Sequence, residues 1–204
     1  MATLALVLYV VYLLLAFGLR TLIQLRRTGS TGFHGLGGRP GSAEWIAGVG
    51  FAVALLLGAA APVLALLGWV EPIGALDASV AHVLGAVLAL LGIAATFYAQ
   101  VAMGTSWRIG VDPEERTALV TTGPFALVRN PIFAAMLPTA LGLTLLVPSW
   151  VALAGLVGLV LALELQVRVV EEPYLLRAHG GAYADYAARV GRFFPGVGRI
   201  GNAG

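Results

Sequence analysis

The sequence contains no cysteine and no lysine, and few of its residues carry a charge. The lack of cysteine excludes disulfides, thiolate metal sites and cysteine nucleophiles. Charged residues make up 11% of the 204 residues, against about 25% in soluble domains. The net charge of +2 is too small to indicate a nucleic-acid partner. His34 and His82 have no partners at ligand spacing, so we assign neither a metal site nor a catalytic role to them.

What the chain has in excess is apolar sequence. Hydrophobic residues make up 59% of the chain and the mean hydropathy is +0.92, which is a membrane composition. One domain is expected at this length. The N-terminal apolar run lacks the basic start of a signal peptide and is longer than its usual core, so we expect a retained helix.

The apolar residues fall into five segments, which predict an all-α integral membrane bundle of about five helices. The segments are Ala2 to Leu19, Ala43 to about Trp69, Val80 to Met103, Ile132 to Val147, and Ser149 to about Val170. The fourth is short for a span of roughly 20 residues. We therefore predict that the last two form a tight helical hairpin, followed by a cytoplasmic amphipathic helix.

The arginines alternate between the loops and predict the orientation. Basic loops follow the first, third and fifth segments, whereas the second loop carries only Glu71 and Asp77 and the fourth is very short. We predict a multi-pass protein of the cell membrane with its N-terminus outside, and with its C-terminus and active site in the cytoplasm. The basic loops carry Arg20, Arg26, Arg27 and Arg39; Arg108, Arg116 and Arg129; and Arg168, Arg177, Arg189, Arg192 and Arg199.

The first basic loop, Thr28 to Ser42, is rich in glycine. It matches neither a P-loop, because no Gly-Lys-Ser/Thr follows, nor a dinucleotide fingerprint, because Pro40 takes the place of the third glycine. A flexible connector is the favoured interpretation, and a lid over a cytoplasmic site is the functional alternative.

The stretch from Gly123 to Phe133 leads from a polar segment into an apolar helix. Pro131 suits the first helical position, and Asn130 before it is a good N-cap. Arg129 is then expected just outside the positive end of the helix. Such a helix start favours a carboxylate or a phosphate.

A second group of candidate residues lies at the C-terminal end of the fifth segment. The spacing predicts that Glu164, Arg168 and either Glu171 or Glu172 share one helical face. A charge at the end of an apolar run suggests function, although an ion network of purely structural value is the alternative. With Arg129 and the aromatic residues downstream, these side chains are expected to enclose one pocket. A ligand with both a carboxylate and an ammonium or ribose group, such as S-adenosylmethionine, would suit it, as would a nucleotide or a zwitterionic lipid headgroup.

The motif Leu-Val-Thr-Thr-Gly-Pro-Phe at 119–125, followed by Arg-Asn-Pro-Ile-Phe at 129–133, resembles the signature of the isoprenylcysteine carboxyl methyltransferase family. The glutamate pair Glu171-Glu172 and the ending Arg-Phe-Phe-Pro at 192–195 also match. The resemblance covers roughly residues 98–195. It implies one domain over 1–204, with variable helices and the glycine-rich loop in 1–78 and a cofactor-binding catalytic core in 79–195.

The resemblance also implies a site for S-adenosylmethionine. The positions that match the family's cofactor residues are Thr117, Ala118, Leu119, Val120, Phe125, Asn130, Pro131, Ile132, Phe133, Glu171 and Glu172. Asn130 stands where the family has histidine, and Phe125 and Phe133 replace tyrosines. The family associates an arginine one turn before the glutamates with the substrate, and Arg168 is the nearest candidate.

The resemblance implies methyl transfer from S-adenosylmethionine to a lipophilic acceptor in the membrane, and we favour an isoprenoid- or lipid-linked carboxylate as that acceptor. Arg168, together with Arg129, would orient an anionic acceptor, and Glu172 would be the general base if the acceptor were an amine. Two alternatives stay open, which are an NADPH-dependent membrane reductase of the steroid-reductase type and a non-catalytic scaffold or transport subunit. The sequence leaves the oligomeric state and the acceptor unassigned.

Overall fold

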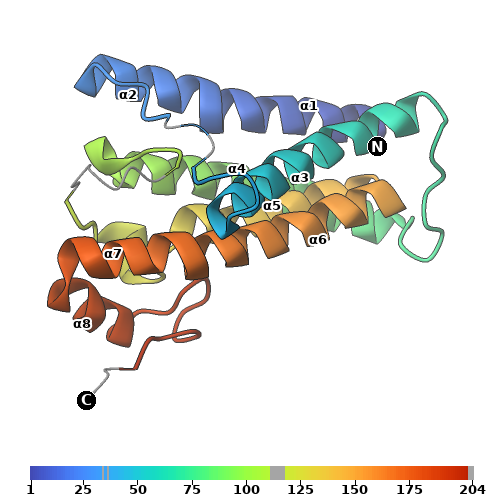
Figure 1. Cartoon of the computed structure of the whole chain (residues 1–204). Coiled ribbons are helices and arrows are strands. Elements are labelled where there is room, and N and C mark those ends of the chain that lie inside the picture. Colours follow the sequence, from blue (N-terminus) through green and yellow to red (C-terminus); the bar gives the residue numbers. More distant parts are fainter. Residues whose placement is uncertain (34, 36, 111–117, 202–204) are drawn as a thin grey trace.

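The computed structural model describes residues 1–33, 35, 37–110 and 118–201, and it confirms the all-α prediction (Figure 1). Within these residues the only β-type pairings are two isolated bridges. The α-helices are α1 (Ala2–Leu13), α2 (Arg20–Thr28), α3 (Ala43–Leu66), α4 (Ser79–Ala102), α5 (Pro131–Leu146), α6 (Trp150–Leu165), α7 (Glu172–His179) and α8 (Gly181–Arg189). The described residues also form two π-helical segments and two short 3-10 helices. These are η1 (Leu14–Leu19), η4 (Gln166–Glu171), η2 (Gly104–Ser106) and η3 (Gly123–Ala126).

Four continuous helices are long and apolar enough to cross a membrane. A fifth, α5, is shorter, as its sequence predicts. The predicted second, third and fourth segments correspond to α3, α4 and α5 and are confirmed. The protein is therefore a multi-pass membrane protein. The four long helices cover Ala2–Thr28, Ala43–Leu66, Ser79–Ala102 and Trp150–His179.

The first helix is longer than predicted. It continues through η1 and α2 to Thr28, whereas the sequence places its end at Leu19, before the arginines. The expectation is wrong because Arg20 is not in a loop but is almost completely buried inside the bundle, where backbone carbonyls accept its hydrogen bonds. The helix ends instead at Gly29, whose φ of +75° is a left-handed conformation that favours glycine.

The fifth segment is also longer than predicted. It runs as one rod of 30 residues from Trp150 to His179, so the amphipathic residues around Tyr174 continue the same helix. The separate amphipathic helix is α8, which packs beside α7 at the end of this rod (Figure 1). The tight hairpin between α5 and α6 is confirmed, with Ser149 capping α6 by accepting a hydrogen bond from the amide of Ala152 at 3.3 Å.

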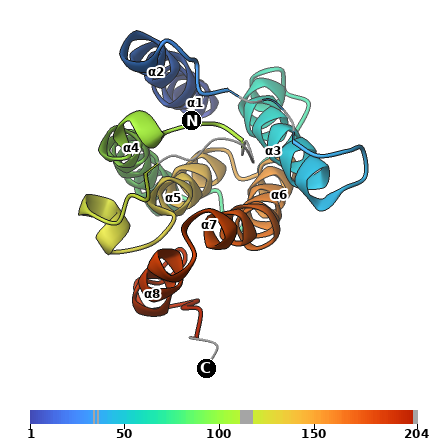
Figure 2. The same ribbon diagram turned by 60° about the vertical axis from the view of Figure 1, so that its left-hand side comes forward.

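Helix α5 lies in the middle of the bundle, in contact with α1, α3, α4 and α6 (Figure 2). Its closest neighbour is α4, because small residues let the two backbones approach. A Cβ added at Gly142 of α5 would lie 2.4 Å from the carbonyl oxygen of Gly85 in α4. At Gly92 of α4, an added Cβ would lie 2.3 Å from the hydroxyl of Thr139 in α5.

Candidate active site

Glu172 is a buried carboxylate at the centre of the candidate site. It is the first residue of α7, immediately after the π-helical segment η4, and is 6% exposed. Its Oε1 accepts hydrogen bonds from Nη2 of Arg129 at 2.6 Å and from Nε of Arg192 at 2.8 Å. Its Oε2 accepts one from Nη2 of Arg192 at 2.9 Å. One glutamate thus joins two arginines that come from different parts of the chain.

Arg129 is equally buried, at 5% exposed, and it holds the C-terminal end of α8. Its Nη1 donates to the carbonyls of Ala187 at 2.9 Å and Val190 at 2.5 Å, and its Nη2 donates to Gly198 at 3.0 Å. Carbonyls in the last turn of a helix have no partner within the helix and carry its negative dipole end, so a cation stabilises them.

Arg192 is the essential partner that the sequence analysis leaves out of the site. The signal was present, because Arg192 opens the Arg-Phe-Phe-Pro ending that contributes to the family resemblance. Hydrogen bonding to Glu172 raises the pKa of Arg192 above its already high usual value. The three side chains of Arg129, Glu172 and Arg192, called here the arginine–glutamate cluster, therefore carry a net charge of +1.

A short backbone pairing brings the start of α5 to the segment after α8. Val128 and Gly191 form a parallel bridge, and the amide of Arg129 donates to the carbonyl of Gly191 at 2.8 Å. The amide and the side-chain Nδ2 of Asn130 both donate to the carbonyl of Arg192, at 3.1 and 3.2 Å.

Asn130 occupies the N-cap position and Pro131 the first helical position, as predicted. The expected capping by the Asn130 side chain is wrong, however, because the side chain makes no cap hydrogen bond. The amide group is turned toward Arg192 instead. Pro131 has no N–H, and the first helical hydrogen bond of α5 runs from the amide of Ala134 to the carbonyl of Asn130 at 2.8 Å. The amides of Ile132 and Phe133 therefore belong to the first turn, which has no acceptor within the helix.

An aromatic cluster lies beside the arginine–glutamate cluster. Tyr183 and Tyr186 of α8 meet edge to face with ring centroids 6.2 Å apart. The hydroxyl of Tyr186 donates to the carbonyl of Phe125 at 2.6 Å. Burial raises the pKa of Tyr186 to about 12. Leu119 packs against the same cluster.

Only some of the predicted cofactor residues lie close together in the structure. Leu119, Phe125 and Asn130 lie against α8 and the segment that follows it, whereas Ile132 and Phe133 pack on the core of the bundle. Ala118 is exposed, and its carbonyl accepts a hydrogen bond from the hydroxyl of Ser106 at 3.2 Å. Val120 is half-buried and Pro131 is buried. Thr117 lies outside the described residues.

Among the described residues, Glu171 and Arg168 form their hydrogen bonds outside the arginine–glutamate cluster. Glu171 is half-buried, and its Oε1 accepts a hydrogen bond from Gln166 at 3.3 Å. The side chain of Arg168 is 58% exposed and pairs with Glu164 one turn earlier. Arg168 thus pairs with Glu164, as the spacing predicts, whereas Glu172 pairs with Arg129 and Arg192.

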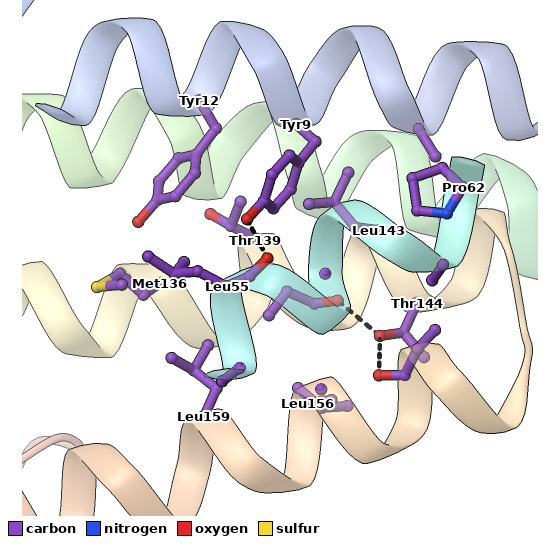
Figure 3. A pocket seen from close by; sticks show the side chains of 17 residues that line it. Tyr9, Tyr12, Leu55, Pro62, Met136, Thr139, Leu143, Thr144, Leu156 and Leu159 are labelled. Carbon is purple, nitrogen blue, oxygen red and sulfur yellow. Dashed lines mark hydrogen bonds between the residues drawn. The ribbon is translucent and has the colours of Figure 1, made fainter. Parts of the chain in front are cut away.

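A separate cavity of about 50 Å³ lies within the bundle, between α1, α3, α5 and α6 (Figure 3). Its walls are largely apolar, and the rings of Tyr9 and Tyr12 lie on its α1 side (Figure 3). None of the residues predicted for the cofactor or the acceptor lines it. This cavity is therefore distinct from the candidate active site.

Residues 80–182 match the model of a protein family described as phospholipid methyltransferase. This range covers half of the chain and includes Arg129 and Glu172. The chain belongs to the phospholipid methyltransferase family. It is thus a member of an integral membrane methyltransferase family, as the resemblance predicts.

Two known proteins resemble the chain more broadly. The solved structure of the eukaryotic intramembrane Ras methyltransferase, an isoprenylcysteine carboxyl methyltransferase, superposes with a TM-score of 0.56. The match has 19% identity and covers 91% of this chain and 75% of that one, which confirms the predicted fold resemblance. The nickel-cobalt-cadmium resistance protein NccN of Alcaligenes xylosoxydans xylosoxydans is 30% identical over 108 residues, 52% of this chain and 50% of that protein. The chain spans about half the length of that relative.

Proposed function

We propose that the protein transfers a methyl group from S-adenosylmethionine to a lipophilic acceptor that resides in the membrane. The observation that carries the proposal is the arginine–glutamate cluster, in which Glu172 ties the signature segment before α5 to the segment after α8. The family signature and the C-terminal helices are thereby held as one unit at one end of the bundle (Figure 1).

The groups around this cluster have the chemistry that the cofactor requires. The cluster has a net charge of +1, and the N-terminal end of α5, which carries the positive end of the helix dipole, lies beside it through Asn130. Both features favour a carboxylate. The half-buried carboxylate of Glu171 suits an α-ammonium group. S-adenosylmethionine would supply an electrophilic methyl group on a sulfonium, and its transfer requires no covalent enzyme intermediate. The protein's contribution is then to bind, orient and exclude water.

The geometry favours positioning roles for Arg129 and Glu172. Both nitrogens at the end of the Arg129 guanidinium already donate to protein oxygens, and Glu172 is neutralised by two arginines. A carboxylate held in this way is a poor general base. An acceptor that needs no general base, such as a carboxylate, is therefore favoured over an amine.

Arg168 is the candidate for contact with the acceptor. It lies at the end of the apolar part of the long rod formed by α6, η4 and α7, and its side chain is largely exposed. At this depth Arg168 can exchange its ion pair with Glu164 for one with an anionic headgroup of the acceptor. The apolar chain of the acceptor then stays in the lipid.

The experiment that tests the proposal is calorimetry on the detergent-purified protein with S-adenosylmethionine and, separately, with NADPH. We expect binding of the first and not of the second. Labelled methyl transfer into a membrane lipid extract then identifies the product, because a methyl ester releases its label in base and an N-methyl group does not. Binding of NADPH alone would favour the reductase, and binding of neither would favour the scaffold.

A further inference from the structure

Arg20 is a buried arginine in the first helix, and it lies outside the residues 80–182 that match the family. It is 1% exposed and follows the π-helical segment η1. The oxygens that accept its hydrogen bonds belong to uncharged groups. Its Nε donates to the carbonyl of Gln100 at 3.2 Å, its Nη2 to the carbonyl of Gly104 at 2.5 Å, and its Nη1 to Oε1 of Gln24 at 3.1 Å.

These contacts fix the end of α4 and the 3-10 turn after it. The last carbonyls of α4 lack helical partners and form its negative dipole end, which a cation stabilises. The guanidinium also lies over the ring of Trp107, 4.5 Å from its centroid. Gln24 adds a hydrogen bond from Nε2 to the carbonyl of Thr105 at 2.8 Å. The segment from Gly104 to Trp107 is therefore held mainly by the first helix.

The same segment reaches the candidate active site. The hydroxyl of Ser106 donates to the carbonyl of Ala118, the first described residue of the predicted cofactor segment. The next residue but one, Arg108, places its guanidinium carbon 5.2 Å from the ring centroid of Tyr174. Tyr174 lies in α7, two residues after Glu172. The segment thus connects the first helix with both the cofactor segment and α7.

We propose that Arg20 is a positioning residue for methyl transfer, which acts through the segment Gly104–Trp107 on the cofactor segment that begins at Ala118. The inference rests on the proposed function. The first helix lies outside the residues 80–182 that match the family. The inference assigns this helix a role in the reaction. A buried charge within a membrane helix is costly, and an apolar side chain could fill the same space. The planar guanidinium donates several hydrogen bonds and thereby fixes the orientation of a polar segment, which an apolar side chain cannot do.

The test compares Arg20→Met and Arg20→Lys with the control Arg26→Met, which alters an exposed arginine of the same helix. The dissociation constant and KM for S-adenosylmethionine, kcat and the melting temperature are measured for each variant in detergent. We expect Arg20→Met to weaken cofactor binding and raise KM by about tenfold, which corresponds to about 1.4 kcal/mol. Arg20→Lys should recover part of the loss, and Arg26→Met should behave as the parent protein.

A double-mutant cycle separates positioning from general stability. Ser106→Ala removes the hydrogen bond to Ala118, so its effect on cofactor affinity should be strongly non-additive with that of Arg20→Met if both act through one segment. A folded Arg20→Met protein with the parent dissociation constant and KM would overturn the inference, as would full additivity. If Arg20→Met does not fold, Arg20→Lys and Gln24→Ala serve in the same cycle.

Failure of the proposed function gives a different result. In that case the parent protein itself binds no S-adenosylmethionine. Hydrogen exchange of residues 104–110 and 118–120 in the same variants then shows whether Arg20 fixes this segment. Unchanged protection in Arg20→Met would overturn the positioning role independently of any cofactor.

Discussion

Arg129 and Glu172 lie 43 positions apart in the sequence and form a buried ion pair, with 2.6 Å between Nη2 and Oε1. The pair joins Arg129, two positions before the start of α5, to the first residue of α7. Because Arg192 binds the same carboxylate, removal of the negative charge would leave the buried guanidinium of Arg129 and the half-buried one of Arg192 without their counter-ion.

Glu172→Gln should therefore destabilise the protein and weaken cofactor binding together. Breaking a buried ion pair from one side costs about 3–5 kcal/mol, and the loosened segment before α5 would no longer be held against α8. The melting temperature in detergent and calorimetry with S-adenosylmethionine measure the two effects.

Glu164→Gln is the matched control for Glu172→Gln. It removes the same charge from the exposed pair with Arg168, where solvent screening limits the contribution to about 0–1 kcal/mol. Equal losses of stability in the two variants would show that Glu172 is not the centre of the cluster.

Asn130 offers a second test of the contact between α5 and the segment after α8. Asn130→Ala loses the side-chain hydrogen bond to the carbonyl of Arg192, which is worth about 1 kcal/mol. Asn130→His, the residue usual in the resembling family, can donate from its imidazole to the same carbonyl. We expect Asn130→His to keep the parent melting temperature and cofactor affinity, and Asn130→Ala to lower both. The two variants would behave alike if the hydrogen bond were unimportant.

The helix starts and the hairpin could be predicted from the sequence because their signals are local. Pro131 after Asn130 marks the start of α5, and Pro148-Ser149 separates two apolar runs. The end of the first helix could not be predicted in this way. Arg20 can stay in the helix because the carbonyls of Gln100 and Gly104 accept its hydrogen bonds. These residues lie 80 and 84 positions away in the sequence, so no local pattern predicts the contact.

The candidate site also combines features that the sequence predicts with contacts that it does not. The signature residues and Glu172 can be found from the sequence, but helical spacing does not show which side chains bind them. Spacing places Arg168 near Glu164 and near either Glu171 or Glu172, and in the structure Arg168 pairs with Glu164. Glu172 is bound instead by Arg129 and by Arg192, which lies 20 positions further along the chain, and no helical spacing predicts these tertiary contacts.

The two tyrosines of the cavity provide a matched pair. The hydroxyl of Tyr9 donates to the carbonyl of Leu55 at 2.5 Å (Figure 3), whereas that of Tyr12 is buried and lacks a partner within the described residues. Tyr9→Phe should cost about 1 kcal/mol, the net value of one hydrogen bond. Tyr12→Phe should leave stability unchanged or raise it, because it removes an unsatisfied buried hydroxyl. Melting temperatures in detergent compare them, and a larger loss for Tyr12→Phe would indicate an occupant that binds its hydroxyl.

The close packing of α4 and α5 predicts a strong penalty at Gly142. In Gly142→Ala the new Cβ would meet backbone atoms of Gly85 and Ala89 at 2.4–2.5 Å, so the helices must separate, at a cost of about 1–3 kcal/mol. Gly158→Ala is the control, because its Cβ would meet Ala54 at an ordinary 3.8 Å. There alanine should be neutral or stabilising, since it favours the helix by up to about 1 kcal/mol. Similar melting temperatures for the two variants would contradict this account.

The proposed orientation follows from the distribution of charge between the two ends of the bundle. Arg26 and Arg27 lie at the same end as α7 and α8, whereas Glu71 and Asp77 lie in the loop at the opposite end (Figure 1). Since positive loops stay in the cytoplasm, the candidate active site should face the cytoplasm. A reporter fused to the C-terminus should be active inside the cell, and one inserted between Glu71 and Asp77 should be active outside. A C-terminal reporter active only outside would reverse the orientation and would separate the site from the cytoplasmic supply of the cofactor.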